Sequence, residues 1–337
     1  MAPPLVFGIR CHGLIESKFS RFILLLFFVV SISSPAFTAE FQNGPYKHVS
    51  PTDVGTKIGV GVVAQIPVIE YSGDTTLTTS VTIENKVING CLVIDADNVT
   101  VRNSIINCNS NYPLKIINGR GGSQIEYSKI NCSSSGKVFY FPSGAPDTTV
   151  AYNEAIGCQD FFFMNGNLDG LQVKNNYMHT LVGLPAAHAD GFQIGTGGAS
   201  TGNIHIQGNY FDADNLGIGK TDIIFAVTNS AVEIIYEDNY IEPWGHYTHR
   251  CHGDTKCIIR NNVFSQAFDG IEQNLLLANA TRVAEFACNR YANGEFVKDS
   301  FNNQTLIHGA QHNTDNCPDF NTKSDATIVP VIQLLLD

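Results

Sequence analysis

Short alternations of apolar and polar residues recur along the chain, and each is followed by a bend rich in asparagine. In each copy, two inward-pointing residues lead to a polar pair, and another apolar residue follows five positions after the last inward one. Six copies are clear, at residues 98–108, 123–132, 171–178, 204–211, 234–241 and 257–264, and a divergent copy runs from 148 to 158. The pattern predicts a short strand, a tight bend and the start of the next strand.

The spacing of the copies predicts one coil of a parallel β-helix per copy. The steps are 24, 26, 22, 33, 30 and 23 residues when the equivalent positions are Val101, Ile125, Ala151, Val173, Ile206, Tyr236 and Ile259. Repeats of this size are typical of solenoids. We therefore expect an all-β, single-domain right-handed parallel β-helix. A helical bundle or a β-sandwich is disfavoured, because neither a sustained 3.6-residue period nor hairpin signals occur.

Four asparagines fall at one offset, three residues after the equivalent positions. They are Asn176, Asn209, Asn239 and Asn262. Stacked bends would turn them into a ladder, with amides bonded along the axis and the asparagines in the left-handed backbone that the bend needs. We assign them a structural role.

The first 39 residues are typical of a signal peptide. Basic residues precede an apolar run at 22–30, and small residues follow at Ala36 and Ala39. We therefore expect residues 1–39 to be a leader and the protein to be secreted, outside the cell or in the cell wall. We expect the remaining chain to form an N-terminal cap at 40–75, a catalytic β-helix at 76–285 and a C-terminal cap or tail at 286–337, because solenoids need covered ends.

Eight cysteines remain beyond this leader, and an even number in an exported chain predicts disulfides. Cys108 and Cys132 share one offset on adjacent coils, so we expect a bond between them, with two free buried thiols as the alternative. Further bonds are expected at Cys251–Cys257 and Cys288–Cys317. N-glycosylation sequons at Asn98, Asn131, Asn279 and Asn303 agree with export.

A net charge of −11 argues against nucleic acid as a partner, because phosphate binding needs a basic face. An anionic sugar polymer remains compatible with this charge if a local cationic cleft exists. The apolar run at 328–336 is too short for a membrane span. We expect a monomer with an acidic polysaccharide as its partner.

The two longest coil steps, from 173 to 206 and from 206 to 236, are where we expect the chemistry, because insertions in repeat folds often carry binding surfaces. Tyr177 and His179 precede the first insertion, which ends in the segment 188–193. Asp190 and Lys220 both lie 16 residues before their next equivalent positions, so we expect them side by side.

Two rows should flank these insertions. Tyr177, Tyr210 and Tyr240 share one offset, and His179, Asp212 and Glu242 share another.

The next coil carries an aromatic and cationic patch. Its members are Trp244, His246, Tyr247, His249 and Arg250. Aromatic faces stack on sugar rings and arginine pairs with carboxylates, so we expect the patch to bind an acidic polysaccharide. The histidines have helix-like spacing on an expected loop, so we expect neither a metal nor another cofactor.

An acidic polysaccharide can be cut by hydrolysis or by β-elimination. Hydrolysis needs a pair of carboxylates, and the motifs of solenoid pectin hydrolases do not occur. Elimination needs a group that neutralises the uronate carboxylate, a base for the C5 proton and an acid for the departing O4. Lys220 is our candidate base and Tyr177 our candidate acid. His188, Gln193 or Arg250 could bind the carboxylate.

These residues resemble those of secreted β-helix polysaccharide lyases, particularly alginate lyases. The resemblance covers about residues 95–270 and rests on the bend at 176–179, the segment 188–193 and Lys220. It implies a fold and a reaction class, the β-elimination of a polyuronate.

In similar lyases a lysine and a tyrosine act as base and acid. This implies those roles for Lys220 and Tyr177, with His188 and Gln193 near the uronate carboxylate. We count His188 among the catalytic residues, and Asp190 and His179 among those that bind substrate. Tyr247 is the alternative acid. Calcium-dependent relatives use an acidic cluster without a clear equivalent here, so the resemblance implies a metal-free mechanism.

Two other functions stay open. A mannuronan C5-epimerase would remove the same proton and return one from the opposite face, but its usual Asp-Pro-His-Asp motif is absent from this sequence. A non-catalytic wall-binding solenoid would need the patch at 244–250, while Lys220 and Tyr177 would be dispensable.

Overall fold

The structure is a computed structural model. It describes residues 69–132, 135–181, 188–212, 222–227, 229–242, 247–264, 277–278, 283–298, 300–301, 304–305 and 311–318. The predicted leader at 1–39 and the sequons at Asn279 and Asn303 lie outside the described residues. No segment within these ranges forms a helix with the length and hydropathy that crossing a membrane requires.

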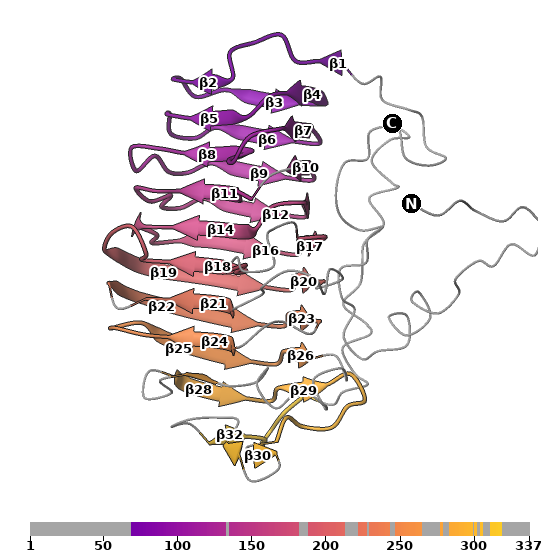
Figure 1. Ribbon diagram of the computed structural model, residues 1–337, viewed down its shortest axis with the longest axis vertical. Helices are drawn as coiled ribbons and strands as arrows, with labels where there is room; N and C mark the ends of the chain where they lie inside the picture. The colour runs from indigo at the N-terminus through magenta and orange to yellow at the C-terminus, as the bar shows by residue number, and fades with distance from the viewer. Residues whose placement is uncertain are drawn as a thin grey trace, which may run out of the picture.

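The described strands stack into three long parallel sheets, called A, B and C below (Figure 1). Sheet A contains β1 (Ile69–Glu70), β4 (Lys86–Asn89), β7 (Ile105–Cys108), β10 (Lys129–Cys132), β13 (Glu154–Ile156), β17 (Tyr177–His179), β20 (Tyr210–Phe211), β23 (Tyr240–Ile241), β26 (Val263–Phe264) and β29 (Arg290–Tyr291). Sheet B contains β2 (Thr76–Leu77), β5 (Leu92–Ile94), β8 (Leu114–Ile116), β11 (Lys137–Phe141), β14 (Asp160–Met164), β18 (Phe192–Ile194), β21 (Asp222–Ala226), β24 (Tyr247–Cys251) and β27 (Leu277–Ala278). Sheet C contains β3 (Thr82–Glu84), β6 (Thr100–Arg102), β9 (Gln124–Glu126), β12 (Thr149–Ala151), β16 (Leu171–Lys174), β19 (Ser200–Gln207), β22 (Ser230–Glu237), β25 (Lys256–Arg260), β28 (Val283–Ala287) and β32 (His312–Asn313), with β15 (Gly166–Asn167) beside β19.

Each coil gives one strand to each sheet, and each strand pairs with its counterpart on the next coil. The predicted all-β solenoid of parallel strands is therefore confirmed. Parallel pairing begins at Ile69, inside the segment expected as an N-terminal cap, and continues to Asn313, inside the expected C-terminal cap. Between β29 and β32, β30 (Ser300–Phe301) and β31 (Gln304–Thr305) form a small antiparallel pair.

The core is built from rows of inward side chains that occupy the same register position on successive coils. Phe139, Phe162 and Phe192 share one register position on β11, β14 and β18. Their ring centroids lie 4.6 and 4.8 Å apart, close to the spacing between strands, so each ring stacks on the next. The period of two along each short strand sends these side chains into the solenoid and leaves their neighbours outside.

The predicted asparagine ladder is present and longer than expected. Each ladder asparagine accepts a backbone N–H from the previous coil at its Oδ1, at 2.9–3.0 Å. The predicted members are confirmed, and the ladder also contains Asn153 and Asn289. Ser104 and Ser128 continue it toward the N-terminus. All eight side chains are buried, so the ladder satisfies backbone N–H groups that water does not reach.

Asn153 was missed because the divergent copy is one residue out of the predicted register. Val150, and not Ala151, pairs with Ile125 and Val173. Both Val150 and Ala151 are buried, so the inward and outward alternation is ambiguous at this copy. With Val150 as the equivalent position, Asn153 falls at the ladder offset.

The left-handed backbone of the bends lies one residue before the ladder, so the prediction that the ladder asparagines adopt it is wrong. Asn175, Asp238 and Asn261 have φ values of 53°, 58° and 55°. Gly208 takes this place before Asn209, with φ 67°. The left-handed residue turns the chain, and the asparagine that follows is then buried along the axis, where it bonds to both neighbouring coils.

Four disulfides link the described strands and bends: three join neighbouring coils, and one closes a short loop between β24 and β25 of a single coil. They are Cys91–Cys108, Cys132–Cys158, Cys251–Cys257 and Cys288–Cys317. The last two were predicted and are confirmed. The predicted Cys108–Cys132 bond is wrong, although these residues are partners in the β7–β10 register. That bond would leave Cys91 and Cys158 three coils apart, about 14 Å, which a disulfide cannot bridge.

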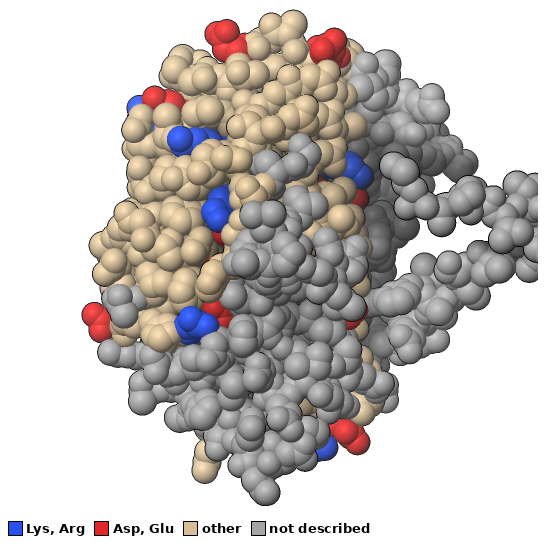
Figure 2. Space-filling view, in the orientation of Figure 1, with Lys and Arg blue, Asp and Glu red and all other residues tan. Residues whose placement is uncertain are grey.

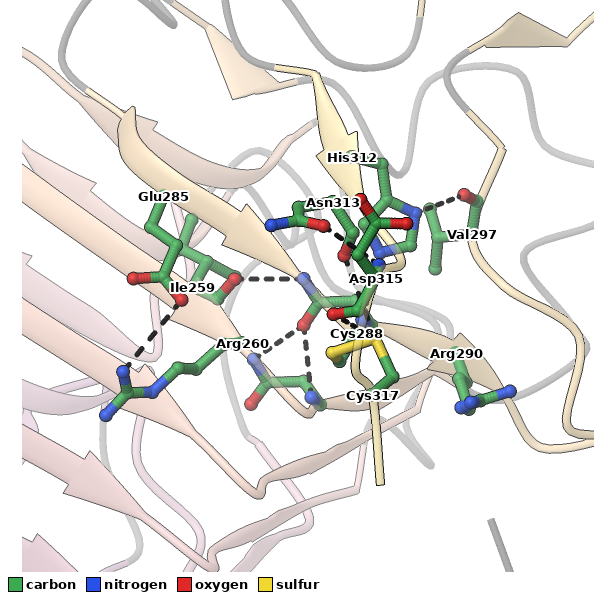
Figure 3. Close-up of a disulfide and its surroundings, with 12 residues drawn as sticks. Ile259, Arg260, Glu285, Cys288, Arg290, Val297, His312, Asn313, Asp315 and Cys317 are labelled. Carbon is green, nitrogen blue, oxygen red and sulfur yellow. Dashed lines mark hydrogen bonds and ion pairs between the residues drawn. A yellow bond between two sulfur atoms is a disulfide. The ribbon is translucent and has the colours of Figure 1, made fainter. Parts of the chain in front are cut away.

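A histidine ends the ladder beside the Cys288–Cys317 disulfide (Figure 3). His312 Nε2 accepts the N–H of Asn289 at 3.0 Å. The other ring nitrogen, Nδ1, lies 2.8 Å from the carbonyl oxygen of Val297 and must therefore carry the proton. The disulfide and the histidine together fix the last described coil to the solenoid.

Removing one ladder side chain should destabilise the fold more than removing the same side chain at the surface. Asn209→Ala leaves buried N–H and carbonyl groups of neighbouring coils without partners, and we expect the free energy of unfolding to fall by about 2–4 kcal/mol. Asn89→Ala is the matched control, because Asn89 bonds Glu70 and Asn107 at an exposed position. It should cost at most about 0.5 kcal/mol. Urea titration followed by circular dichroism measures both, and equal costs would contradict the ladder's role.

Candidate functional site

The two long insertions lie at the corner where sheet A passes into sheet B. One runs from β17 to β18 and the other from β20 to β21. Their predicted lengths are confirmed, because Val173 pairs with Ile206 and Ile206 with Tyr236. The two insertions therefore connect the same two sheets on successive coils.

Part of the predicted site lies outside the described residues. This includes Lys220, the candidate base, and Trp244 and His246 of the patch. Tyr247 is described by its backbone alone, in β24 at the register position of Asp222. The residues below are those whose side chains the structure describes.

On sheet A, the predicted tyrosine row is confirmed. Tyr177 pairs with Tyr210, and Tyr210 with Tyr240. The Tyr177 hydroxyl donates to Asp212 Oδ2 at 2.9 Å, and the Tyr210 hydroxyl donates to Glu242 Oε1 at 3.4 Å. Each phenol is therefore bonded to a carboxylate on the next coil.

His179 lies beside Tyr177 in the same strand. The two rings stack with their centroids 4.2 Å apart, and His179 Nε2 lies 3.2 Å from Glu154 Oε1. Glu154 also accepts from Lys129 at 3.1 Å. Burial raises the pKa of the Glu154 carboxyl, but its bonds to His179 and Lys129 outweigh that effect and lower its pKa. Tyr177, His179 and Asp212 therefore form one group on sheet A.

On sheet B, six consecutive outward side chains share a register position that continues to Val93 and Thr76, and we call these six the sheet-B row. They are Lys115, Tyr140, Phe163, Gln193, Phe225 and Arg250. Each is partly exposed. The Arg250 guanidinium carbon lies 4.9 Å from the centroid of the Phe225 ring. Two predicted substrate-binding residues, Gln193 and Arg250, therefore belong to the same row.

Beside the row runs a line of three buried aspartates, which we call the carboxylate ladder. Asp160 Oδ1 accepts the N–H of Asp190 at 2.9 Å, and Asp190 Oδ1 accepts the N–H of Asp222 at 3.1 Å. Lys137 Nζ contacts Asp160 at one end. Arg250 Nη2 lies 3.4 Å from Asp222 Oδ2 at the other. The ladder thus has one cation at each end and links Arg250 to the solenoid interior.

Burial dominates the ionisation of this ladder. It raises the pKa of Asp160 to about 7, with Lys137 opposing the rise and Asp190 adding to it. It raises the pKa of Asp222 to about 8, against the attraction of Arg250. These carboxyls therefore change charge near neutral pH, where ordinary aspartates are fully ionised.

Asp222 occupies the position opposite Asp190, the position that residue counting gives to Lys220, and Lys220 itself lies outside the described residues. Phe192 pairs with Ile224 in the β18–β21 register, and Asp190 and Asp222 each lie two residues before one of these paired residues. The Asp190 side chain is 1% exposed, so its carboxylate acts within the ladder and not on a surface that a polymer reaches.

A sequence signal for the ladder existed but was overlooked. Each aspartate lies two residues before a buried apolar residue of a sheet-B strand: Asp160 before Phe162, Asp190 before Phe192 and Asp222 before Ile224. The recurrence of this spacing on three coils predicts a stacked row of carboxylates.

The prediction that His249 binds substrate is wrong, because its side chain is buried. Its side chain is 1% exposed and its ring packs edge-to-face on Tyr236, with centroids 4.7 Å apart. Burial lowers the pKa of His249 to about 3, so its imidazole is neutral. The sequence predicts a loop for the patch, whereas residues 247–251 form β24, where alternation sends His249 inward and Arg250 outward.

His188 differs from Asp190 in facing solvent. Its side chain is exposed, and its backbone carbonyl accepts from Gln159 Nε2. Among the described residues on the face drawn in Figure 2, charged side chains are sparse and scattered. Within the described residues, no group of three or more histidine, cysteine, aspartate or glutamate side chains is arranged to hold a metal ion.

Comparison with protein-family models, with curated protein sequences and with solved structures gave no match.

The carboxylate ladder predicts that stability falls as the pH rises through neutrality. The folded-state pKa values of Asp160 and Asp222 lie above those of the unfolded chain, so the folded state binds more protons between the two sets of values. We expect the free energy of unfolding to drop by on the order of 1–3 kcal/mol between about pH 6.5 and pH 9. His249 acts with the opposite sign below this window, since its folded pKa is lowered.

Denaturant titrations at several pH values measure this dependence. Asp222→Asn should flatten the upper part of the curve. Asp97→Asn is the control, because Asp97 is exposed and lies outside the ladder. A stability that rises between neutral and alkaline pH would contradict the buried, proton-binding ladder.

Proposed function

We propose that this protein is a secreted polysaccharide lyase that cleaves a polyuronate such as alginate by β-elimination. The observation that carries the proposal is the placement of Arg250. Its guanidinium stands on the outer face of sheet B, over Phe225 and beside Asp222, in line with Gln193. An anchored, partly exposed guanidinium in a row with an amide suits a uronate carboxylate, which accepts paired N–H donors.

Arg250 and Gln193 can serve one substrate. They lie two coils apart on the same row, about 10 Å along the axis. Asp222 holds the guanidinium from the buried side, and Phe225 covers one of its faces. Binding a carboxylate there would lower the barrier to removing the C5 proton by stabilising the negative charge that develops.

The proton transfers are assigned to Lys220 and Tyr177. In the proposed reaction Lys220 takes the proton from C5, the electron pair forms the C4–C5 double bond, and O4 leaves with a proton from Tyr177. Tyr177 comes from the same corner of the solenoid as the insertion that contains Lys220. Its proton is directed at Asp212 in the free protein, so substrate would have to replace that bond.

The remaining expectations belong to this proposal. The four disulfides are consistent with an extracellular protein. The proposal also includes a cleaved leader at 1–39, a single right-handed domain and a monomeric state. We propose the right-handed winding because crossovers between parallel strands are almost always right-handed.

A second candidate function is a non-catalytic polyuronate-binding solenoid. The bond from the Tyr177 hydroxyl to Asp212 favours it, because this phenol already has a partner on sheet A. The sheet-B row would bind a polymer in the same way without any proton transfer. A C5-epimerase remains an outcome of the assay below.

The lyase proposal is tested by incubating the secreted protein with polymannuronate, polyguluronate and pectate. A lyase produces unsaturated ends that absorb ultraviolet light, and Lys220→Ala or Tyr177→Phe should reduce the rate at least about 100-fold. Lys174→Ala and Tyr152→Phe are matched controls on other faces. Elimination by a neutral lysine should be fastest at mildly alkaline pH, so a maximum at acidic pH would argue against Lys220 as the base.

Two other results have defined meanings. A changed sugar ratio by NMR without new absorbance would identify an epimerase. Binding without either change would identify a non-catalytic solenoid and contradict the proposed lyase.

A further inference from the structure

A second cationic group lies at the far end of the sheet-B row. Tyr112 and Tyr140, on neighbouring coils, stack with centroids 4.1 Å apart and rings 18° from parallel. Lys115 Nζ lies 5.9 Å from the Tyr112 centroid and 5.3 Å from that of Tyr140. The ammonium is therefore held against two aromatic rings, at the distance of cation–π contacts.

Tyr140 contributes a donor to this group. Burial, followed by the neighbouring Tyr112, raises the pKa of the Tyr140 phenol, so it keeps its proton at neutral pH. An ammonium beside a phenol hydroxyl offers several hydrogen-bond donors and a positive charge. This is the chemistry that a carboxylate requires.

The charges of the row differ from those of the whole chain. The protein carries a net charge of −11, yet the row has a cation at each end and no acidic side chain among its described members. Between Lys115 and Arg250 lie only aromatic rings and the amide of Gln193. Some lysines and arginines elsewhere on the described coils bond to acidic partners, such as Lys129 with Glu154, and Arg250 itself bonds Asp222 from the buried side. The row therefore favours an extended anion.

We propose that Tyr112, Lys115 and Tyr140 form a second carboxylate-binding subsite for the same acidic polysaccharide that Arg250 binds. This rests on the proposed polyuronate substrate but not on its cleavage. Lys115 and Arg250 lie five strand steps apart on sheet B, which corresponds to about 24 Å. That length spans several sugar rings, so one chain lying along the solenoid axis places carboxylates at both ends of the row.

Two linked subsites make affinity depend on ligand length. A short oligouronate reaches one subsite, whereas a long one reaches both, and its second contact forms at a high effective concentration. The subsite thus selects long chains over their own fragments. Because Lys115 is far along the row from Arg250, its loss should leave the binding of a short ligand at Arg250 unchanged.

Binding of oligomannuronates of defined length tests the proposal. Isothermal titration calorimetry would use the Tyr177→Phe protein, with ultraviolet absorbance confirming that the ligand survives. We expect octasaccharide to bind at least about 10-fold more tightly than disaccharide, and Lys115→Met and Tyr140→Ala to remove most of that gain. Lys174→Met, on sheet C, is the control for loss of a lysine. Far-ultraviolet circular dichroism and the thermal midpoint show whether each variant is folded.

The outcomes separate the subsite from the activity. Equal loss of octasaccharide affinity in Lys115→Met and Lys174→Met would overturn the subsite, as would a folded Lys115→Met protein that binds the octasaccharide like its parent. Length-dependent binding lost with Lys115 supports the subsite even if the wild-type protein makes no unsaturated product. In that case only the proposed lyase activity fails.

Discussion

The hydrogen bonds between successive coils set the positions of the side chains on the described strands of this protein. Parallel strands repeat one register from coil to coil, so residues at the same place in each turn lie in rows about 4.8 Å apart. The buried asparagine ladder fixes that register, since each amide bonds a backbone group of the coil before it. A slip by one residue would leave these N–H groups without partners inside the solenoid.

The same repetition generates the candidate site. Outward positions on sheet B become a row that ends in Arg250, and the neighbouring positions become the carboxylate ladder that holds this arginine from behind. Stacking three carboxylates in the interior is costly unless they hold protons or cations. The raised pKa values of Asp160 and Asp222 and the contacts of the end members with Lys137 and Arg250 show both solutions. The exposed sheet-B row and the buried carboxylate ladder therefore both follow from the same strand register.

Much of this arrangement could be predicted from the sequence, because a repeated spacing becomes a spatial row. The tyrosine row at Tyr177, the four central ladder asparagines and the coil lengths around the insertions follow directly from counting residues. Counting fails where the pattern is ambiguous. Two buried residues in succession, Val150 and Ala151, shifted one copy and hid Asn153.

Other predictions were wrong because residue spacing alone does not determine which cysteines pair or which face of a strand a side chain occupies. Cys108 and Cys132 are neighbours in register, but sulfur pairing depends on all four stacked cysteines. His249 belongs to a strand whose alternation buries it, and neighbouring residues gave that segment the composition of a loop. Counting gives Lys220 the place that Asp222 occupies, because it runs back from sheet C, and the connection from sheet B to sheet C is two residues shorter on the second of the two coils.

Amide hydrogen exchange tests the shared register most directly. Backbone N–H groups of Asn153, Asn176, Asn209 and Asn239 each donate to a buried asparagine on the next coil. They should exchange only when the whole solenoid unfolds and should be among the slowest in the protein. Exchange of these amides as fast as that of exposed bend residues would contradict a solenoid held in register by the asparagine ladder.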